Sequence, residues 1–361
     1  MGFVLSIKIK RQDAQIIFNS ALSLAKGSST LPVEWTSHAR AVFDLDAKTW
    51  TPALCTLLLA KATDERVDAL SIKLEESNPR SYNFRSLGHD VVVPAAVEHR
   101  FSIRTTGREP LNNQPFFRYD RIDKIDRVRR MSDLSYFLEV ARSADRLSAR
   151  EAKLALAAFL RTALEISAKV RSVRVKTRGL TAMGLRVAVS DFLRYDAADR
   201  PPRLQAFAAA CLDLMFDDVR TRRINDPSRD LPGDVHAMAD AEVLLAMEVR
   251  GKRVSQSDLI SFALRCAELN IHRAVMFVDA PQQPSLALKN LSKEPGLQDV
   301  QVEVFEWSAA LLNPVLLWSS RPHEKTINGF AEAMLDRLRE IEVPPATLEE
   351  WTRAVAIARG E

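Results

Sequence analysis

The chain has 361 residues, of which 47% are hydrophobic and 27% charged, an ordinary globular composition that excludes a disordered protein. Its length allows two domains or one large one. The net charge of +4 and the pI of about 9.0 are only a weak indication of a polyanionic partner. Cys55, Cys211 and Cys266 are too far apart for a disulfide framework or a zinc pair, so we interpret them as core thiols in a reducing compartment.

Nothing in the sequence indicates export or membrane insertion. No apolar run reaches the roughly 18 residues that a membrane-spanning helix needs. The first ten residues contain neither a charged leader before the apolar part nor a cleavage-site pattern. We therefore expect a cytoplasmic protein.

The N-terminal part is predicted to be mostly helical up to about residue 75. Apolar residues recur at helical spacing from Ala14 to Leu24, a polar break at 27–32 ends that helix, and helical patterns resume beyond it. The segment 80–130 lacks clean periodicity and is rich in Arg, Asn, Pro and aromatic residues. We expect a short helix and then a long irregular loop there, and such a loop is uncommon unless it binds something.

The second half of the chain alternates between helical and strand patterns. Ser148 and Glu151 form a capping-box pattern for a helix over 149–171, and Pro202 begins another helix that ends near Val219. The further predicted elements are a β-hairpin over 232–252, a helix over 257–269, a strand over 273–278, a short helix over 285–292, a strand over 300–305, and helices over 308–318 and 324–340.

This order of elements predicts the fold class and a domain division. Helices that alternate with a hairpin and further strands predict an α/β domain, in which helices flank a mixed sheet. We place the boundary near residue 148. Residues 1–147 would then form a mostly helical region with a recognition loop at about 80–130, and residues 148–361 would form the α/β domain.

The hairpin carries residues that could hold a metal ion. Asp234 opens its first strand and Glu248 lies near the end of its second, and adjacent strands are about 4.8 Å apart. Mg²⁺ binds one or two carboxylates together with water and phosphate oxygens. Asp234 and Glu248, with the Val249 carbonyl as an additional ligand, therefore form our predicted metal site. An ion there could activate water and neutralise charge in phosphodiester hydrolysis.

A cation follows the second acid at a strand-compatible spacing. Because side chains alternate along a strand, Arg250 shares a face with Glu248 and could stabilise charge that develops on a phosphate. The pattern 232–234 with 248–250 resembles the PD-(D/E)XK nuclease motif, with one inserted glycine and with arginine in place of the usual lysine. Arginine cannot act as a base, so either Arg250 acts electrostatically or Lys252 takes the lysine role.

Other polar residues near the hairpin have two interpretations each. Asp240 and Glu242 are interpreted as solvated acids of the turn, in competition with Asp234 and Glu248. His236 is either a packed histidine or a substrate contact. Gln256 opens the next helix, where it either takes part in capping or, as a candidate DNA contact, approaches a phosphate at the helix N-terminus.

The irregular loop carries side chains of the kinds that read base edges. Arginine pairs with guanine, and asparagine or glutamine pairs with adenine. The candidates in this loop are Arg104, Arg108, Asn112, Asn113, Gln114 and Arg118. Phe116, Phe117 and Tyr119 could stack on bases or anchor the loop in the core, so a surface loop pinned by phenylalanines remains an alternative.

Basic residues elsewhere are candidates for phosphate contacts. Nine Arg or Lys against four Asp or Glu lie between Arg100 and Arg130, and five basic residues with no acid lie between Lys169 and Arg178. Cations alternate at Arg174 and Lys176, which fits either phosphate contact or a solvated edge. The candidates just before the hairpin are Arg222, Arg223, Ser228 and Arg229.

Two of these stretches together resemble a known enzyme family. The loop 106–116 and the pattern 232–235 with 248–249 are similar to those of type II restriction endonucleases of the SacI family, and the resemblance runs over residues 80–320. It implies Mg²⁺-dependent cleavage of double-stranded DNA at a short palindromic site by a homodimer. A two-fold dimer is also the geometry that readout of a palindrome favours. The recognition sequence remains open.

Three other hypotheses are compatible with the same residues. Arg250 in the lysine position motivates a DNA-binding protein that has lost cleavage. A modification-dependent nuclease would need an aromatic pocket, whereas the tryptophans are scattered and interpreted as core residues: Trp35, Trp50, Trp307, Trp318 and Trp351. In the third hypothesis the chain is a helical interaction module and the hairpin is merely part of its core.

Overall fold

The chain forms two compact units, Met1–Arg171 and Ser172–Glu361. The computed structural model describes residues 6–103, 111, 114–221, 231–319 and 322–361. The units part after Arg171 rather than near residue 148. The reason lies in helix α8 (Ala149–Ser172), because Leu156, Phe159 and Ala163 on its buried face belong to the core of the first unit.

The first unit is mostly helical, as predicted, and the polar break at 27–32 separates its first two helices. The segment 80–130 contains more helix than expected. The elements of this unit are α1 (Arg11–Lys26), α2 (Val33–Asp44), α3 (Trp50–Thr63), α4 (Phe84–Leu87), a π-helical turn (Gly88–Val92), α5 (Val93–Glu98), α6 (Gln114–Arg118), a 3₁₀ turn (Ile122–Lys124), α7 (Met131–Asp145) and α8.

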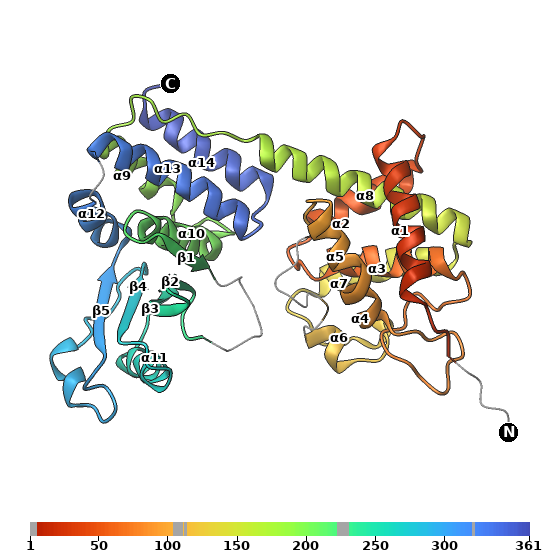
Figure 1. Cartoon of the computed structure of the whole chain (residues 1–361), viewed down its shortest axis with the longest axis horizontal. Helices are drawn as coiled ribbons and strands as arrows, with labels where there is room; N and C mark the ends of the chain where they lie inside the picture. The colour runs from red at the N-terminus through yellow and green to blue at the C-terminus, as the bar shows by residue number, and fades with distance from the viewer. Residues whose placement is uncertain (1–5, 104–110, 112–113, 222–230, 320–321) are drawn as a thin grey trace. The chain divides into compact units, whose positions relative to one another are not determined.

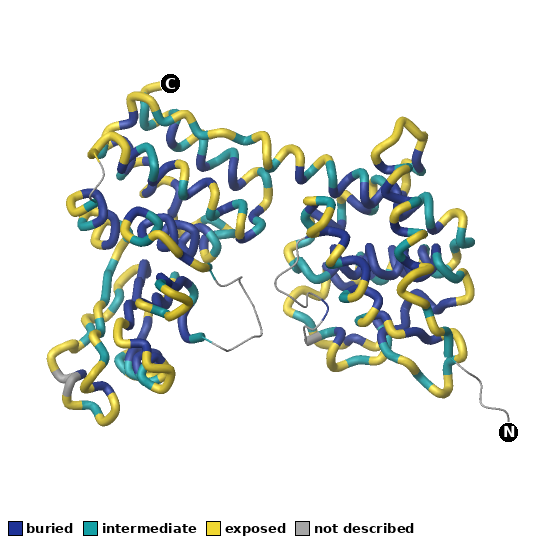
Figure 2. Tube along the Cα trace, in the orientation of Figure 1, coloured by how far each residue is buried: buried dark blue, intermediate teal, exposed yellow. Residues whose placement is uncertain are grey.

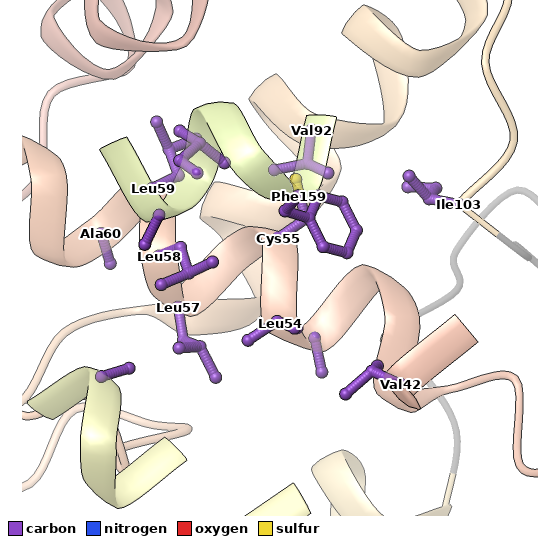
Figure 3. Packing of buried hydrophobic residues seen from close by; sticks show 14 of the residues in the cluster. Val42, Leu54, Cys55, Leu57, Leu58, Leu59, Ala60, Val92, Ile103 and Phe159 are labelled. Atoms are coloured by element: carbon purple, nitrogen blue, oxygen red, sulfur yellow. The ribbon is translucent and has the colours of Figure 1, made fainter. Parts of the chain in front are cut away.

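Helix α3 is the centre of this unit's core. Every residue from Trp50 to Ala62 is buried, so the helix is surrounded on all sides (Figure 2). Figure 3 shows Leu54 and Leu58 of α3 in the cluster that also contains Phe159 of α8. Burying one such leucine contributes about 1.5–3 kcal/mol, so this cluster is a main source of the unit's stability.

The second unit combines a sheet with helices, which confirms the predicted fold class (Figure 1). Its elements are α9 (Ala182–Phe192), α10 (Arg200–Asp213), β1 (Asp218–Thr221), β2 (Val235–Ala239), β3 (Glu242–Arg250), α11 (Gln256–Glu268), β4 (Arg273–Val278), a 3₁₀ turn (Leu288–Lys293), β5 (Gln301–Glu306), α12 (Ser308–Trp318), α13 (His323–Glu340) and α14 (Pro345–Ala358).

Three features of this unit differ from the sequence-based expectation. The helix expected to reach Val219 ends at Asp213, because Val219 lies in β1 and pairs with Ala237 of β2. The short helix expected over 285–292 is a 3₁₀ turn that begins only at Leu288. Helices α9 and α14 were not predicted at all.

The five strands form one mixed sheet in the order β1-β2-β3-β4-β5. β1, β2 and β3 pair antiparallel, whereas β3, β4 and β5 pair parallel. Helix α11 covers one face, where Phe262 packs with Ala246 and Met276, and α10 covers the other, where Phe207 packs on Phe277. The carboxyl ends of β3, β4 and β5 therefore meet at one edge, which is where open α/β sheets commonly bind ligands.

No helix in the described part of the chain combines the length and the apolar character that crossing a bilayer requires.

Candidate active site at the open end of the hairpin

The predicted hairpin is present, and its turn is tight. Ala239 pairs with Glu242, so only Asp240 and Ala241 connect the strands. Both residues have positive φ, 49° and 69°, which is the requirement of the hairpin turn whose twist matches the strands. We call this the turn end of the hairpin, and the opposite end, which carries Asp234 and Glu248, the open end.

Gly233 brings Asp234 to the open end. Its φ is +88°, and a Cβ atom at this position would lie 2.8 Å from the Met247 carbonyl oxygen, so the chain can pass β3 this closely only with glycine. Asp234 then donates its N–H to the same oxygen at 2.8 Å. The register ends where Val235 pairs with Met247, and Asp234, just before β2, bonds the backbone on both sides of Glu248, at the Met247 carbonyl and the Val249 N–H. Asp234 and Glu248 therefore lie at the same end of the hairpin, beside the last residues of β3.

The carboxylate of Asp234 continues the hydrogen-bond ladder where β2 has ended. Its Oδ2 accepts the N–H of Val249 at 2.9 Å. Because the N–H and C=O of one strand residue point to the same side, the Val249 carbonyl faces the side of Asp234 as well. Gln205 of α10 donates to the Asp234 carbonyl at 3.1 Å and ties this end of the hairpin to the helix behind it.

Glu248 is 7% exposed and forms an ion pair with Arg250, whose side chain is about half exposed. Both residues lie on the face that α11 covers. Burial raises the pKa of the Cys266 thiol on α11 to about 12, and the charge of Glu248 adds to this shift. Hydrogen bonds from Ser255 lower the pKa of Asp258, with a smaller contribution from Arg250. The first turn of α11 therefore lies within electrostatic reach of Arg250.

Lys252, the other candidate for the lysine role, is exposed beyond Gly251. It makes no hydrogen bond or ion pair with any residue that the structure describes. The side chain is therefore available for a substrate contact, in contrast to Arg250, which is already paired with Glu248.

The donor set at the open end suits a hard cation. It consists of two carboxylates and one backbone carbonyl, all oxygen donors. Within the described residues no cluster of three or more His, Cys, Asp or Glu could hold a metal. Mg²⁺ commonly uses only one or two carboxylates and completes its shell with water and substrate phosphate, so Asp234 and Glu248 fit this ion.

The remaining polar residues of the hairpin have structural positions. His236 is buried, and its Nε2 lies 2.7 Å from the Pro232 carbonyl oxygen, which supports the packed interpretation. Asp240 and Glu242 are exposed, as expected for acids of the turn. Gln256 bonds the N–H and the C=O of Ala287 at 2.9 and 3.2 Å, so its amide braces a loop, while Ser255 and Asp258 form the capping box of α11.

The described candidates for DNA contacts are mostly exposed cations. Arg174 and Lys176 are exposed on a segment whose backbone carbonyls accept hydrogen bonds from Arg339 of α13 and from Arg359, the residue after α14. Arg118 is exposed at the end of α6, 5.9 Å from the ring of Tyr119. Gln114 begins the same helix. The other candidates, Arg104, Arg108, Asn112, Asn113, Arg222, Arg223, Ser228 and Arg229, lie outside the described residues.

Aromatic residues near the predicted recognition loop and the sheet edge only partly follow the expectation. Phe116 is fully buried against Trp50, whereas Phe117 is 64% exposed, so one phenylalanine anchors the segment. Trp35, Trp50 and Trp351 are core residues as predicted, but the prediction was wrong for Trp307 and Trp318, which are 42% and 72% exposed.

A cavity at the carboxyl edge of the sheet was not foreseen. It has a volume of about 600 Å³, and Tyr195, Asp279 and Trp307 contribute to its lining. Asp279 follows β4 directly and Trp307 follows β5 directly. A polar residue immediately after a buried parallel strand is the sequence signal that could have identified Asp279. Tyr195 comes from the segment after α9, which gave no such signal.

Comparison with known proteins identifies the class of protein to which this chain belongs, the restriction endonucleases. The chain is a member of the SacI family of type II restriction enzymes. A family model described as the SacI restriction endonuclease N-terminal domain matches residues 13–167. The "Type II restriction enzyme SacI" of Streptomyces achromogenes is 37% identical over 356 residues, which cover 96% of this chain and 98% of that relative. The family resemblance noted in the sequence is thus confirmed, and it extends well before residue 80.

Proposed function

We propose that this restriction endonuclease cleaves both strands of DNA at a short palindromic site in a Mg²⁺-dependent reaction, with the open end of the hairpin as its active site. The observation that carries this proposal is the position of Asp234 beside the end of β3, next to Glu248. The Asp234–Val249 hydrogen bond of 2.9 Å supports it, because it fixes one of the two carboxylates. We assign the hairpin to the PD-(D/E)XK type of nuclease site.

Asp234, Glu248 and the Val249 carbonyl would hold the ion. When bound there, Mg²⁺ supplies charge neutralisation at the phosphate and lowers the pKa of a coordinated water. Arg250, and Lys252 beyond it, would stabilise the charge that develops on the phosphate oxygens. The ion pair with Glu248 keeps the guanidinium of Arg250 at the open end of the hairpin.

DNA recognition would use the basic and amide residues that the sequence pattern predicts as DNA contacts. The segment 104–118 would read base edges, whereas Arg174 and Lys176 would contact phosphates through their exposed cations. A homodimer would present two such sets to the two halves of a palindrome. Gln256 is the weakest candidate, because its amide already bonds the backbone of Ala287.

The test compares the two ends of the hairpin. Asp234→Asn with Glu248→Gln removes both charges at the open end, and Asp240→Asn with Glu242→Gln makes the same chemical change at the turn end. Purified proteins are incubated with unmethylated phage DNA and Mg²⁺, and the products are separated on a gel. Loss of metal-bound charge should reduce cleavage by about 1000-fold or more, and the turn-end variant should cut as the wild type does.

Isothermal titration with Mg²⁺ provides a second readout that is independent of cleavage. The open-end variant should lose the heat of Mg²⁺ binding, and the turn-end variant should retain it. Discrete fragments from an open-end variant that still folds would refute the proposal. The ends of the wild-type fragments would give the recognition site.

A modification-dependent nuclease is a second candidate, supported by one observation. The cavity between Tyr195 and Trp307 lies at the same sheet edge as the open end, and aromatic side chains can stack on a displaced base. If the enzyme is of this kind, unmethylated DNA stays intact and methylated DNA of the same sequence is cut. If both DNAs stay intact yet are bound equally well with Mg²⁺ or Ca²⁺, the chain is a binder that has lost cleavage.

A further inference from the structure

A buried ion pair lies immediately beyond the end of β3. Arg200, in the first turn of α10, and Asp279, the residue after β4, are each 7% exposed in their side chains, and Arg200 Nη2 lies 2.9 Å from Asp279 Oδ1. The hydroxyl of Tyr195 donates to the same oxygen at 2.9 Å, and the Ser308 N–H donates to Oδ2 at 3.2 Å. The carboxylate is thus bonded at both oxygens and its position is fixed.

This pair holds the backbone of the residues that follow Glu248. The N–H of Asp279 donates to the Arg250 carbonyl at 2.9 Å, and Arg200 Nη1 donates to the Gly251 carbonyl at 3.3 Å. On the other side of the strand, Asp234 holds the N–H of Val249. Val249, Arg250 and Gly251 therefore each have one backbone group held by a hydrogen bond. Asp234 holds Val249, Asp279 holds Arg250, and Arg200 holds Gly251.

Arg203, one turn further along α10, provides an internal comparison. Like Arg200, it is buried, donates to a carbonyl at the end of α9, stacks on an aromatic ring and pairs with carboxylates. Its partners are Asp199 and Glu350, however, and none of its contacts within the described part of the chain reaches β3. The two arginines share a structural role, and of these two Arg200 contacts Gly251, the residue that directly follows Arg250.

We propose that Arg200 and Asp279 are positioning residues for cleavage, which fix the backbone of Arg250 and Gly251 so that the cations of Arg250 and Lys252 meet the reacting phosphate. The inference rests on the proposed function, in which the open end of the hairpin is the active site. Neither Arg200 nor Asp279 has to touch DNA for this role. A misplacement of about 1 Å at a catalytic group can cost on the order of 100-fold in rate, so a small release of this backbone should be measurable.

The test uses the full-length variants Arg200→Lys, Asp279→Asn and, as the matched control, Arg203→Lys. Lysine keeps the charge, but its single ammonium group cannot bond the Leu193 carbonyl, the Gly251 carbonyl and the Asp279 carboxylate at the same time, as the planar guanidinium does. Cleavage of a duplex oligonucleotide that carries the site gives kcat and KM, and thermal unfolding gives the loss of stability. We expect Arg200→Lys to lower kcat about 100-fold with KM changed less than about threefold, and Asp279→Asn to have a smaller effect of the same kind.

The control decides between positioning and plain stability. Arg203→Lys should lower the melting temperature as much as Arg200→Lys does and leave kcat within about threefold. The inference would be overturned if both arginine variants lost kcat equally, or if Arg200→Lys raised KM and left kcat unchanged. If Arg200→Lys does not fold, Asp279→Asn alone carries the same comparison, and an unchanged kcat there would overturn it. Retained cleavage in the Asp234→Asn, Glu248→Gln variant would instead overturn the proposed function.

Discussion

The hairpin carries two acids at each end, and the two pairs differ in their surroundings although their residue types are the same. At the turn end, Asp240 and Glu242 are exposed, and within the described part of the chain their carboxylates make no hydrogen bond or ion pair. At the open end, Glu248 is 7% exposed and pairs with Arg250, and Asp234 holds a backbone N–H of β3. Identical side chains thus have different surroundings within one element.

This difference shows why the residue pattern alone is a weak signal of function. Electrostatic interactions are several times stronger in a partly buried site than in bulk water, because water screens charge more effectively than protein does. A carboxylate that is held by backbone and shielded from solvent binds a cation more strongly, and in a more defined geometry, than a fully solvated one does. The open end meets that condition because α10 and α11 cover the two faces of the sheet behind it.

The largest effect after loss of the carboxylates is expected from the cation at the open end. Arg250→Met should lower kcat by about 100- to 1000-fold, because it removes the charge paired with Glu248 from the site. Lys252→Met removes the same net charge from an exposed side chain, where water weakens its attraction to the phosphate, and should lower kcat by a smaller factor of about 10-fold. Single-turnover cleavage of a duplex oligonucleotide measures both.

These two variants also decide which residue takes the usual lysine role. They change the net charge equally, so a general weakening of DNA attraction would affect both alike. If Lys252→Met has the larger effect, the exposed lysine is the working cation, and Arg250 serves only to neutralise Glu248.

A smaller but still severe effect is expected at Gly233. In Gly233→Ala a Cβ atom would lie 2.8 Å from the Met247 carbonyl oxygen, which belongs to backbone and cannot turn aside, and φ is +88°. We expect a loss of roughly 1–3 kcal/mol in the free energy of unfolding, together with a lower cleavage rate because Asp234 would move away from Glu248. Chemical denaturation and the cleavage assay measure the two consequences. Wild-type values in both would show that the backbone can pass β3 without glycine.

The sequence predicted those parts of the molecule that depend on local pattern. The strand Arg273–Val278 has the predicted bounds, because it is a continuous apolar run between polar residues and is buried along five of its six positions. The hairpin of β2 and β3 followed from its two apolar runs and the polar turn between them. These features are determined by residues that are neighbours in sequence or across one hairpin.

What the sequence did not predict depends on contacts between distant segments. β1 has only four residues and becomes a strand because it pairs with β2. Helix α9 contains Gly184, an unfavourable helix residue that is needed because a Cβ atom there would lie 2.7 Å from the Ala358 carbonyl oxygen of α14. Arg200 and Asp279 are separated by 79 residues, so no local spacing could have joined them.

The smallest predicted effect concerns the turn end and has the opposite sign. Ala241 has a φ of +69°, a conformation that costs a residue with a Cβ atom about 1–2 kcal/mol. Ala241→Gly removes that cost, offset in part by the greater freedom of glycine in the unfolded chain, and should stabilise the protein by about 0.5–1 kcal/mol. Ala239→Gly, at the strand position just before the turn, is the matched control and should destabilise by a similar amount. Thermal unfolding measures both, and cleavage should stay at the wild-type rate in Ala241→Gly. A loss of activity there would mean that the turn end, with its solvated acids, takes part in the reaction after all.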